Sequence, residues 1–306
     1  MSGTVRSRER PASSAFHAAA VQPLWRTARG TLDLRRPCVV GILNVTPDSF
    51  WDGGRHAGVD AALGRAEVLV RGGAGMLDLG GESTRPGARP VNAAEERARV
   101  LPVLRALVAR WPETPISVDT VKAAVAEAAL AEGAAAINDV GGLRLEPRLA
   151  EVVGAAGAGL VLMHSRGTVD TMASYELASY GADPVAEVRA ELRDALARAR
   201  AGGVADDALV VDPGLGFAKR TEHSVALLAG LERLGELGCP VMVGPSRKRF
   251  LGEVAGGLEA ADRLPGTVAA CVLAFLAGAR LFRVHDVAEV AGALALAEAV
   301  AGGGMP

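Results

Sequence analysis

Eight short runs rich in valine, isoleucine and leucine alternate with segments of helical pattern, and this alternation constrains the fold most strongly. The runs are CVVGILN (38–44), GMLDLGG (75–81), PISVDT (115–120), AAINDV (135–140), GLVLMHS (159–165), ALVVDPG (208–214), PVMVGPS (240–246) and ARLFRVHD (279–286). Mostly continuous apolar runs of this length are typical of strands buried on both faces, as in a parallel sheet. Eight repeats of strand and helix predict a single α/β domain, the (β/α)8 or TIM barrel.

A doubly wound open sheet is the alternative architecture. It usually has a glycine-rich turn after its first strand, whereas Asn44 and a polar loop follow the first run here. Two intervening helices have recognisable starts. Asp183 precedes Pro184, which suits a capping residue followed by the first helical position. Asn92 and Glu95 have the spacing of a capping box.

Residues 1–35 have a different character from the rest of the chain. They are rich in arginine and serine, and they have neither a periodic apolar face nor the apolar core of a signal peptide. We expect a poorly ordered N-terminal extension there, with a transit peptide as the weaker alternative, and a barrel domain over 36–302. The apolar stretch near TVAACVLAFLAGA is too short to span a bilayer and predicts a buried helix.

Charge and cysteine usage narrow the class of protein. The 33 basic and 35 acidic side chains give a net charge of -2, which argues against nucleic acid as a partner. The three cysteines are widely spaced, so neither a disulfide framework nor a structural zinc site is expected. We therefore expect a cytoplasmic protein that acts on small molecules, with no membrane partner.

Nearly every predicted strand ends in a polar or charged side chain. These side chains are Asn44, Asp78, Glu82, Asp119, Asn138, Asp139, His164, Asp212, Ser246, Lys248, Arg283 and His285. Turn-forming residues are common at strand ends for structural reasons alone. In a barrel, however, the carboxyl ends of all strands face one mouth, where active sites lie. The whole ring therefore predicts a site at that mouth, although His164 alone is more typical of a packed residue behind a site.

The charges of this ring divide into two groups. Lys248, Arg283 and His285 are donors after the last two strands, where barrels often bind phosphate. The acceptors are Asp119, Asn138 and Asp212, and they suit the amino and ring N–H groups of a planar heterocycle. A heterocycle joined to a phosphate or diphosphate fits both halves. The alternative is a metal cage, for which carboxylates and an amide favour Mg²⁺ or Ca²⁺.

Two long loops carry residues that a simple connection does not need. NVTPDSFWDGG follows the first run and contains Phe50 and Trp51, while GGESTRPGARPV follows the second and contains Arg85. Their Gly, Pro, Ser and Asp content indicates surface loops. They are candidates for a lid that closes over a reactive intermediate, and exposed Ω-loops without that role are the alternative.

These loops resemble the two signature segments of the dihydropteroate synthase family. The resemblance rests on GILNVTPDSFWDGG (41–54) and LDLGGESTRPGA (77–88), and it continues through SVDT (117–120), INDV (137–140), DPGLGFAK (212–219), GPSRK (244–248) and RVHDV (283–287). It covers roughly residues 37 to 300 in order. The resemblance implies a TIM barrel that joins 6-hydroxymethyl-7,8-dihydropterin diphosphate to 4-aminobenzoate in folate synthesis. The products are 7,8-dihydropteroate and diphosphate, and the expected assembly is a homodimer.

The resemblance also implies roles for individual residues. The pterin diphosphate would contact Thr84, Asp119, Asn138, Asp212, Lys248, Arg283 and His285. The 4-aminobenzoate site, which sulfonamides also occupy, would contain Phe50, Thr84, Pro86, Phe217 and Ser246. Asn44 would bind Mg²⁺ as the cofactor. The residues expected to act in catalysis are Arg85, Asp119, Lys248, Arg283 and His285.

The sequence departs from the family pattern at two positions. Trp51 stands where many members have a small residue, and Ala218 replaces a glycine beside Phe217. Two other functions remain as alternatives. A pterin-binding methyltransferase domain has no need for the diphosphate-binding residues, and a non-catalytic paralogue would be expected to lose loop residues such as Asn44 or Arg85, which are both present.

Overall fold

The structure is a computed structural model that describes residues 23–46, 55–83 and 89–302, without the side chains of 55–57. Five residues singled out in the sequence lie outside the described residues: Phe50, Trp51, Thr84, Arg85 and Pro86.

The predicted barrel is confirmed. Its parallel strands are β3 (Cys38–Asn44), β4 (Met76–Gly80), β5 (Ile116–Asp119), β6 (Ala136–Asp139), β7 (Gly159–Met163), β8 (Leu209–Asp212), β9 (Met242–Val243) and β10 (Leu281–Val284). Each lies within one of the eight predicted runs. The hydrogen-bonded order is β8-β7-β6-β5-β4-β3-β10-β9. A parallel bridge between Val211 and Val241, with the Val211 N–H donating to Pro240 O at 3.0 Å, joins the two outer strands.

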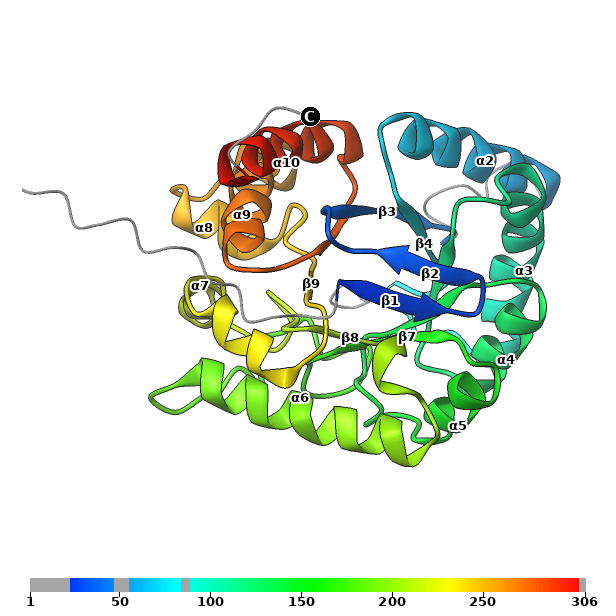
Figure 1. The fold of residues 1–306 in the computed structure, drawn as a ribbon, viewed down its shortest axis with the longest axis horizontal. Coiled ribbons are helices and arrows are strands. Elements are labelled where there is room, and N and C mark those ends of the chain that lie inside the picture. The colour runs from blue at the N-terminus through cyan, green and yellow to red at the C-terminus, as the bar shows by residue number, and fades with distance from the viewer. Residues whose placement is uncertain (1–22, 47–54, 84–88, 303–306) are drawn as a thin grey trace, which may run out of the picture.

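Helices surround the barrel (Figure 1). They are α2 (Arg55–Arg71), α3 (Ala93–Arg110), α4 (Ala123–Ala131), α5 (Arg148–Ala155), α6 (Pro184–Ala201), α7 (Thr221–Ala229), α8 (Arg249–Val254), α9 (Leu264–Leu276) and α10 (Val287–Gly302). The Asn92 side chain caps α3 by accepting from Glu95 N at 2.9 Å, and Asp183 caps α6 through Ala186 N at 3.0 Å. Both predicted helix starts are therefore confirmed. Among the helices of the described residues, none is long and apolar enough to cross a membrane.

A β-hairpin precedes the barrel, and here the sequence prediction was wrong. Strands β1 (Leu24–Thr27) and β2 (Gly30–Asp33) pair antiparallel within the segment that we expected to be a poorly ordered extension. The hairpin lies across the barrel in Figure 1. Trp25 is fully buried, and its Nε1–H donates to Ala208 O at 2.9 Å. The folded domain therefore begins by residue 23 and not at residue 36.

Trp25 and Leu34 from the hairpin region join an apolar cluster inside the barrel. The strands contribute Val40, Met76, Ala136, Val161, Val210, Met242 and Leu281, all at most 1% exposed. Gly159 makes room for the indole, because a Cβ there would lie only 2.8 Å from Trp25 Cζ2. A larger core fills the space between the strands and the helices. The barrel interior is thus packed with apolar side chains on the hairpin side, and its polar residues lie at the opposite mouth.

Candidate active site

The carboxyl ends of the strands bring most of the predicted site residues together. Arg283 of β10 links two of them, because its Nε donates to Asp78 Oδ2 at 2.6 Å and its Nη2 to Asp119 Oδ2 at 2.7 Å. The side-chain amide of Asn138 donates to the same Asp78 oxygen at 3.1 Å. Strands β4, β5, β6 and β10 therefore meet in one buried polar network.

Asp78 is the centre of this network, and the sequence analysis did not assign it a binding role. Its side chain is 1% exposed, and Ser117 Oγ donates to its Oδ1 at 2.5 Å. Together with Asn138 and Arg283, this leaves both carboxylate oxygens paired. The signal was an aspartate between two leucines inside an apolar run, because a buried carboxylate needs partners.

Arg283 retains its positive charge despite its burial. Burial alone disfavours the charged guanidinium, but the carboxylates of Asp78 and Asp119 outweigh it and raise the pKa of Arg283. Burial raises the pKa of Asp119 in turn, while Arg283 opposes that rise. Arg283, the cation expected to face a diphosphate, is therefore already paired with Asp78 and Asp119.

Asp212 of β8 and Lys248, which follows β9, are close enough at the mouth to affect each other's pKa. Burial raises the pKa of Asp212 to about 6, against the Gly214 N–H that donates to it at 2.7 Å. Burial lowers the pKa of Lys248 to about 7, with Asp212 opposing the shift. Lys248 Nζ lies 3.4 Å from the centre of the Phe217 ring, a cation–π arrangement. Phe217 and Lys248, predicted for different substrates, are therefore direct neighbours.

His285 and Ser246 are also brought into contact. Ser246 Oγ lies 2.9 Å from His285 Nδ1 and accepts the His285 backbone N–H at 3.1 Å. Burial, and then the nearby charge of Arg283, lower the pKa of His285 to about 4. The imidazole is consequently neutral at pH 7.

Asn44 ends β3 next to the acidic network. A Cβ placed on Gly80 would lie 3.3 Å from Asn44 Oδ1 and 3.6 Å from Asp119 Cβ, so the two side chains flank that glycine. Within the described residues, no three His, Cys, Asp or Glu side chains are grouped closely enough to hold a metal ion. The metal cage considered for Asp119, Asn138 and Asp212 thus finds no support there.

A second buried group behind the mouth was missed from the sequence. Lys219 is 1% exposed, and its Nζ lies 2.8 Å from His164 Nδ1 and 2.9 Å from Phe217 O. His164 Nε2 lies 3.0 Å from Glu191 Oε2, so this histidine is packed behind the site. Ala218, between Phe217 and Lys219, has a φ of 46°, which favours glycine. The positive φ at position 218 therefore explains why the family usually has a glycine there.

An ion triad anchors the loop that follows β4. Lys122 Nζ pairs with Glu82 at 2.7 Å and with Glu96 at 2.5 Å. Glu82 also accepts the Val91 N–H at 2.8 Å. Glu82 and Val91, which lie on the two sides of the segment that carries Arg85, are therefore linked by a hydrogen bond.

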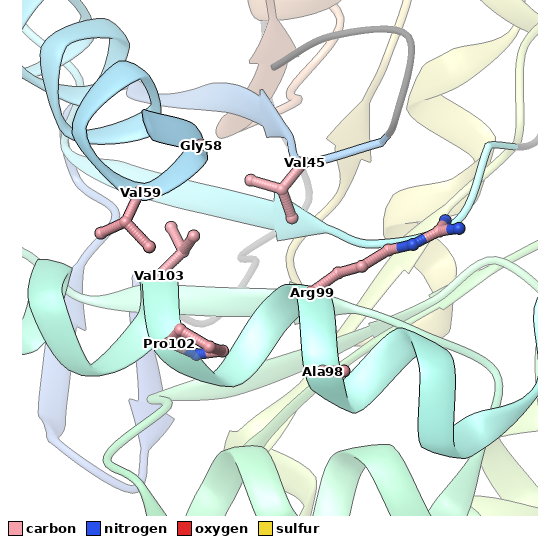
Figure 2. A pocket seen from close by; sticks show the side chains of 7 residues that line it. All are labelled: Val45, Gly58, Val59, Ala98, Arg99, Pro102 and Val103. Atoms are coloured by element: carbon pink, nitrogen blue, oxygen red, sulfur yellow. The ribbon is translucent and has the colours of Figure 1, made fainter. Parts of the chain in front are cut away.

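A small apolar crevice lies apart from this mouth (Figure 2). It is lined by Val45, Gly58, Val59, Ala98, Arg99, Pro102 and Val103, from the end of β3 and from α2 and α3. Its one charged lining residue, Arg99, pairs with Glu95 and donates to Gly81 O at 2.9 Å. Among the described residues, those that line the crevice include none of the polar groups that the predicted chemistry needs.

Comparison with known proteins gives one consistent family. The family model described as "Pterin binding enzyme" matches residues 40–285. The dihydropteroate synthase of Synechocystis is 42% identical over 87% of this chain and 91% of its own length. That of Escherichia coli is 42% identical over 89% of this chain and 95% of its own length.

Solved structures agree in fold and in sequence. The Xanthomonas albilineans dihydropteroate synthase with 4-aminobenzoic acid superposes with a TM-score of 0.83 at 46% identity, over 91% of this chain and 98% of that one. A second structure of that enzyme, with 7,8-dihydropteroate, has a TM-score of 0.78 at 44% identity, over 88% and 95%. The Yersinia pestis enzyme in a sulfonamide drug complex has a TM-score of 0.83 at 41% identity, over 90% and 98%.

Proposed function

The chain belongs to the dihydropteroate synthase family of pterin-binding enzymes, and from this premise we propose how its own residues carry out the reaction. This transferase reaction of folate biosynthesis joins 6-hydroxymethyl-7,8-dihydropterin diphosphate to 4-aminobenzoate. A C–N bond forms at the exocyclic methylene of the pterin, the C–O bond to diphosphate breaks, and the arylamine nitrogen loses a proton.

The pterin ring occupies the acidic half of the mouth. Asp119 and Asp212 accept hydrogen bonds from its N–H groups, and Asn138 both donates and accepts. The support is their shared position at the ends of β5, β6 and β8, together with the burial of Asn138 and Asp212. Lys248 donates from the Phe217 side, next to Asp212. As the leaving group departs, positive charge spreads into the ring, and the two carboxylates favour that charge.

The diphosphate lies against Arg283 and His285. Nε and Nη2 of Arg283 are bound to Asp78 and Asp119, so among the described residues its Nη1 has no partner and can meet the leaving group. His285 is neutral and adds a hydrogen bond rather than a charge. Arg85, outside the described residues, supplies a further positive charge from the loop that the Glu82–Lys122 pair anchors. Thr84 contacts the same substrate from that loop.

Mg²⁺ fits this donor set as a cofactor held mainly by substrate. Mg²⁺ prefers oxygen ligands and commonly uses one or two protein groups with substrate phosphates. Asn44 offers an amide oxygen beside Asp119, and no dedicated cage exists among the described residues. When bound, the ion neutralises negative charge on the departing diphosphate.

The 4-aminobenzoate packs against Phe217, the ring neighbour of Lys248. Phe50, Thr84, Pro86 and Ser246 are the other residues proposed for this site. The similar Xanthomonas enzyme binds 4-aminobenzoic acid and the Yersinia enzyme a sulfonamide, which supports one shared site. The attacking amine is neutral at pH 7 and needs no strong base. Closed loops would exclude water from the electrophilic carbon.

We further propose that the protein is a homodimer in the cytoplasm. Leu273 of α9 and Leu296 and Val300 of α10 are 55%, 68% and 74% exposed, an apolar surface that suits a homodimer interface in the cytoplasm. Sedimentation of the purified protein would measure its oligomeric state directly.

The buried Asp212 carboxylate, with the charge of Lys248 close by, carries this proposal, and Asp212→Asn tests it. The variant should lose pterin binding by at least tenfold, because an acceptor is replaced by a group that donates in part and the charge is lost. Calorimetry with the pterin diphosphate and an assay of diphosphate release with both substrates and Mg²⁺ would measure this. Asp207→Asn, on the hairpin side and bound to Arg26, is the matched control. Unchanged pterin affinity in Asp212→Asn would refute the pocket.

Arg85→Ala tests the loop separately. We expect turnover to fall about 10²- to 10³-fold while pterin affinity changes little, because the charge acts on the leaving group. Single-turnover kinetics would measure the chemical step. A step at wild-type speed would remove Arg85 from the mechanism.

A further inference from the structure

His285 is held at three of its four polar atoms. Its backbone N–H donates to Ser246 Oγ at 3.1 Å, and its backbone oxygen accepts from Arg65 Nη2 at 2.6 Å. Its Nδ1 lies 2.9 Å from the same Ser246 Oγ. Among the described residues, none is bonded to Nε2. The serine and arginine therefore fix which ring atom can reach a ligand.

The hydrogen bonds of Ser246 determine where the ring proton sits. A serine hydroxyl has one proton to donate and two lone pairs to accept with. One lone pair takes the His285 backbone N–H. Ser246 is buried, and Nδ1 is the one acceptor that the described residues offer its hydroxyl. If the hydroxyl donates to Nδ1, that nitrogen carries no proton, and the neutral ring is protonated at Nε2.

The loops that carry the two residues are locked together next to this contact. Arg247, which follows Ser246, makes two bonds to Asp286, which follows His285, at 2.8 and 2.7 Å. The backbone N–H of Arg247 donates to the buried Thr267 Oγ1 at 2.9 Å. Its φ of 52° is unfavourable for a residue with a Cβ, and such conformations persist where surrounding contacts determine them. The Ser246–His285 distance is therefore set by the loop frame.

We propose that Ser246 is a positioning residue that selects the Nε2–H tautomer of His285, so that the neutral ring donates a hydrogen bond to the diphosphate. The opposite tautomer would present a lone pair to an anion. This inference rests on the proposed function, which puts the diphosphate at His285. This role of Ser246 is additional to the contact with 4-aminobenzoate given under the proposed function.

Nitrogen NMR of the full chain labelled with ¹⁵N-histidine tests the tautomer without any turnover. The wild-type His285 signal, identified by its loss in His285→Gln, should show a protonated Nε2 and an unprotonated Nδ1 at pH 7. Ser246→Ala should shift His285 towards the other tautomer, and Ser246→Thr, which keeps the hydroxyl, should restore it. Ser165→Ala, at another buried serine of the same barrel face, should leave His285 unchanged. A protonated Nδ1 in the wild type, or no change in Ser246→Ala, would overturn the proposal.

Kinetics separate this role from 4-aminobenzoate binding. Ser246→Ala should raise KM for the pterin diphosphate about tenfold, in addition to any change in KM for 4-aminobenzoate, with Ser246→Thr near wild type. A rise confined to KM for 4-aminobenzoate would overturn the proposal. His285→Ala checks the premise by itself. If it binds the pterin diphosphate as well as the wild type does, the proposed diphosphate site fails, whereas a wrong tautomer leaves that site standing.

Discussion

The two ends of the barrel differ in their side chains, which are apolar at one end and charged at the other. At the hairpin end, Trp25 and the strand residues around it form a dry apolar cluster in which the indole N–H is paired. At the mouth, the buried Asp78 and the partly buried Asp119 and Arg283 form an ionic network. Apolar burial stabilises a fold directly, whereas buried ion pairs often contribute little net stability because of desolvation. Of the two ends, the closed end is therefore expected to contribute more to stability, and the mouth holds the charged groups.

The largest expected effect is on the closed end. Trp25→Ala should lower the free energy of unfolding by about 3–5 kcal/mol, because a fully buried aromatic side chain is lost and a cavity remains. Denaturant titration would measure the loss. Pterin affinity of the remaining folded protein should stay at the wild-type value. A variant that keeps its stability but loses pterin binding would reverse the comparison.

Asp78→Asn probes the mouth. The substitution removes the negative charge that Arg283 faces and disturbs the hydrogen bonds from Asn138 and Arg283 to Asp78 Oδ2. We therefore expect the free energy of unfolding to fall by about 1.5–3 kcal/mol. Turnover should fall as well, because Arg283 loses one of its two anchors. Asp183→Asn is the control, since Asp183 makes a two-point pair with Arg233 on the exposed surface. Equal losses in both variants would argue that the network has no special role.

Lys248→Met tests whether the charged form of Lys248 lowers the stability of the folded protein. The folded-state pKa of Lys248 is lowered to about 7 from an ordinary value of 10.5, so between these pH values the unfolded chain binds the extra proton. The contribution of this lysine therefore makes stability rise with pH across that window, by at most about 1.4 kcal/mol per pH unit. Lys248→Met should remove this component, as unfolding at pH 7 and pH 9 would reveal. An identical pH dependence in both proteins would contradict it.

The smallest effect is expected at Ala218. Replacement by glycine should raise stability by about 0.5–1 kcal/mol, because relief of the left-handed strain exceeds the added flexibility of the unfolded chain. Thermal unfolding would measure the gain. Ala208→Gly, at a buried alanine without a positive φ, should be destabilising. A loss at both positions would show that Ala218 is not strained.

The fold was predictable because strand burial leaves a direct trace in the sequence. All eight strands lie within the predicted apolar runs, and the ends of two helices follow from Asp183 and Asn92. The hairpin was not predictable in this way. Its strands have four residues each, and one buried tryptophan gives no periodic pattern.

The sequence predicted which strand-end residues come near one another, but it did not predict how their side chains pair. Strand-end position indicated Asp119, Asn138, Asp212 and Arg283, whereas the choice of partners depends on strand order around the barrel. Arg283 and Asp119 are 164 residues apart, and nothing local connects them. Lys219 was overlooked because lysine is normally exposed, and only its three-dimensional neighbours explain its burial.

The position of the hairpin also determines where a protein fused ahead of the barrel would lie. It brings the chain into the barrel at the end opposite the polar mouth, beneath the cluster of Trp25. A carrier, reporter or second enzyme joined at residue 23 would therefore lie on the side of the barrel away from the polar mouth. The hairpin is therefore a suitable junction for a fused protein.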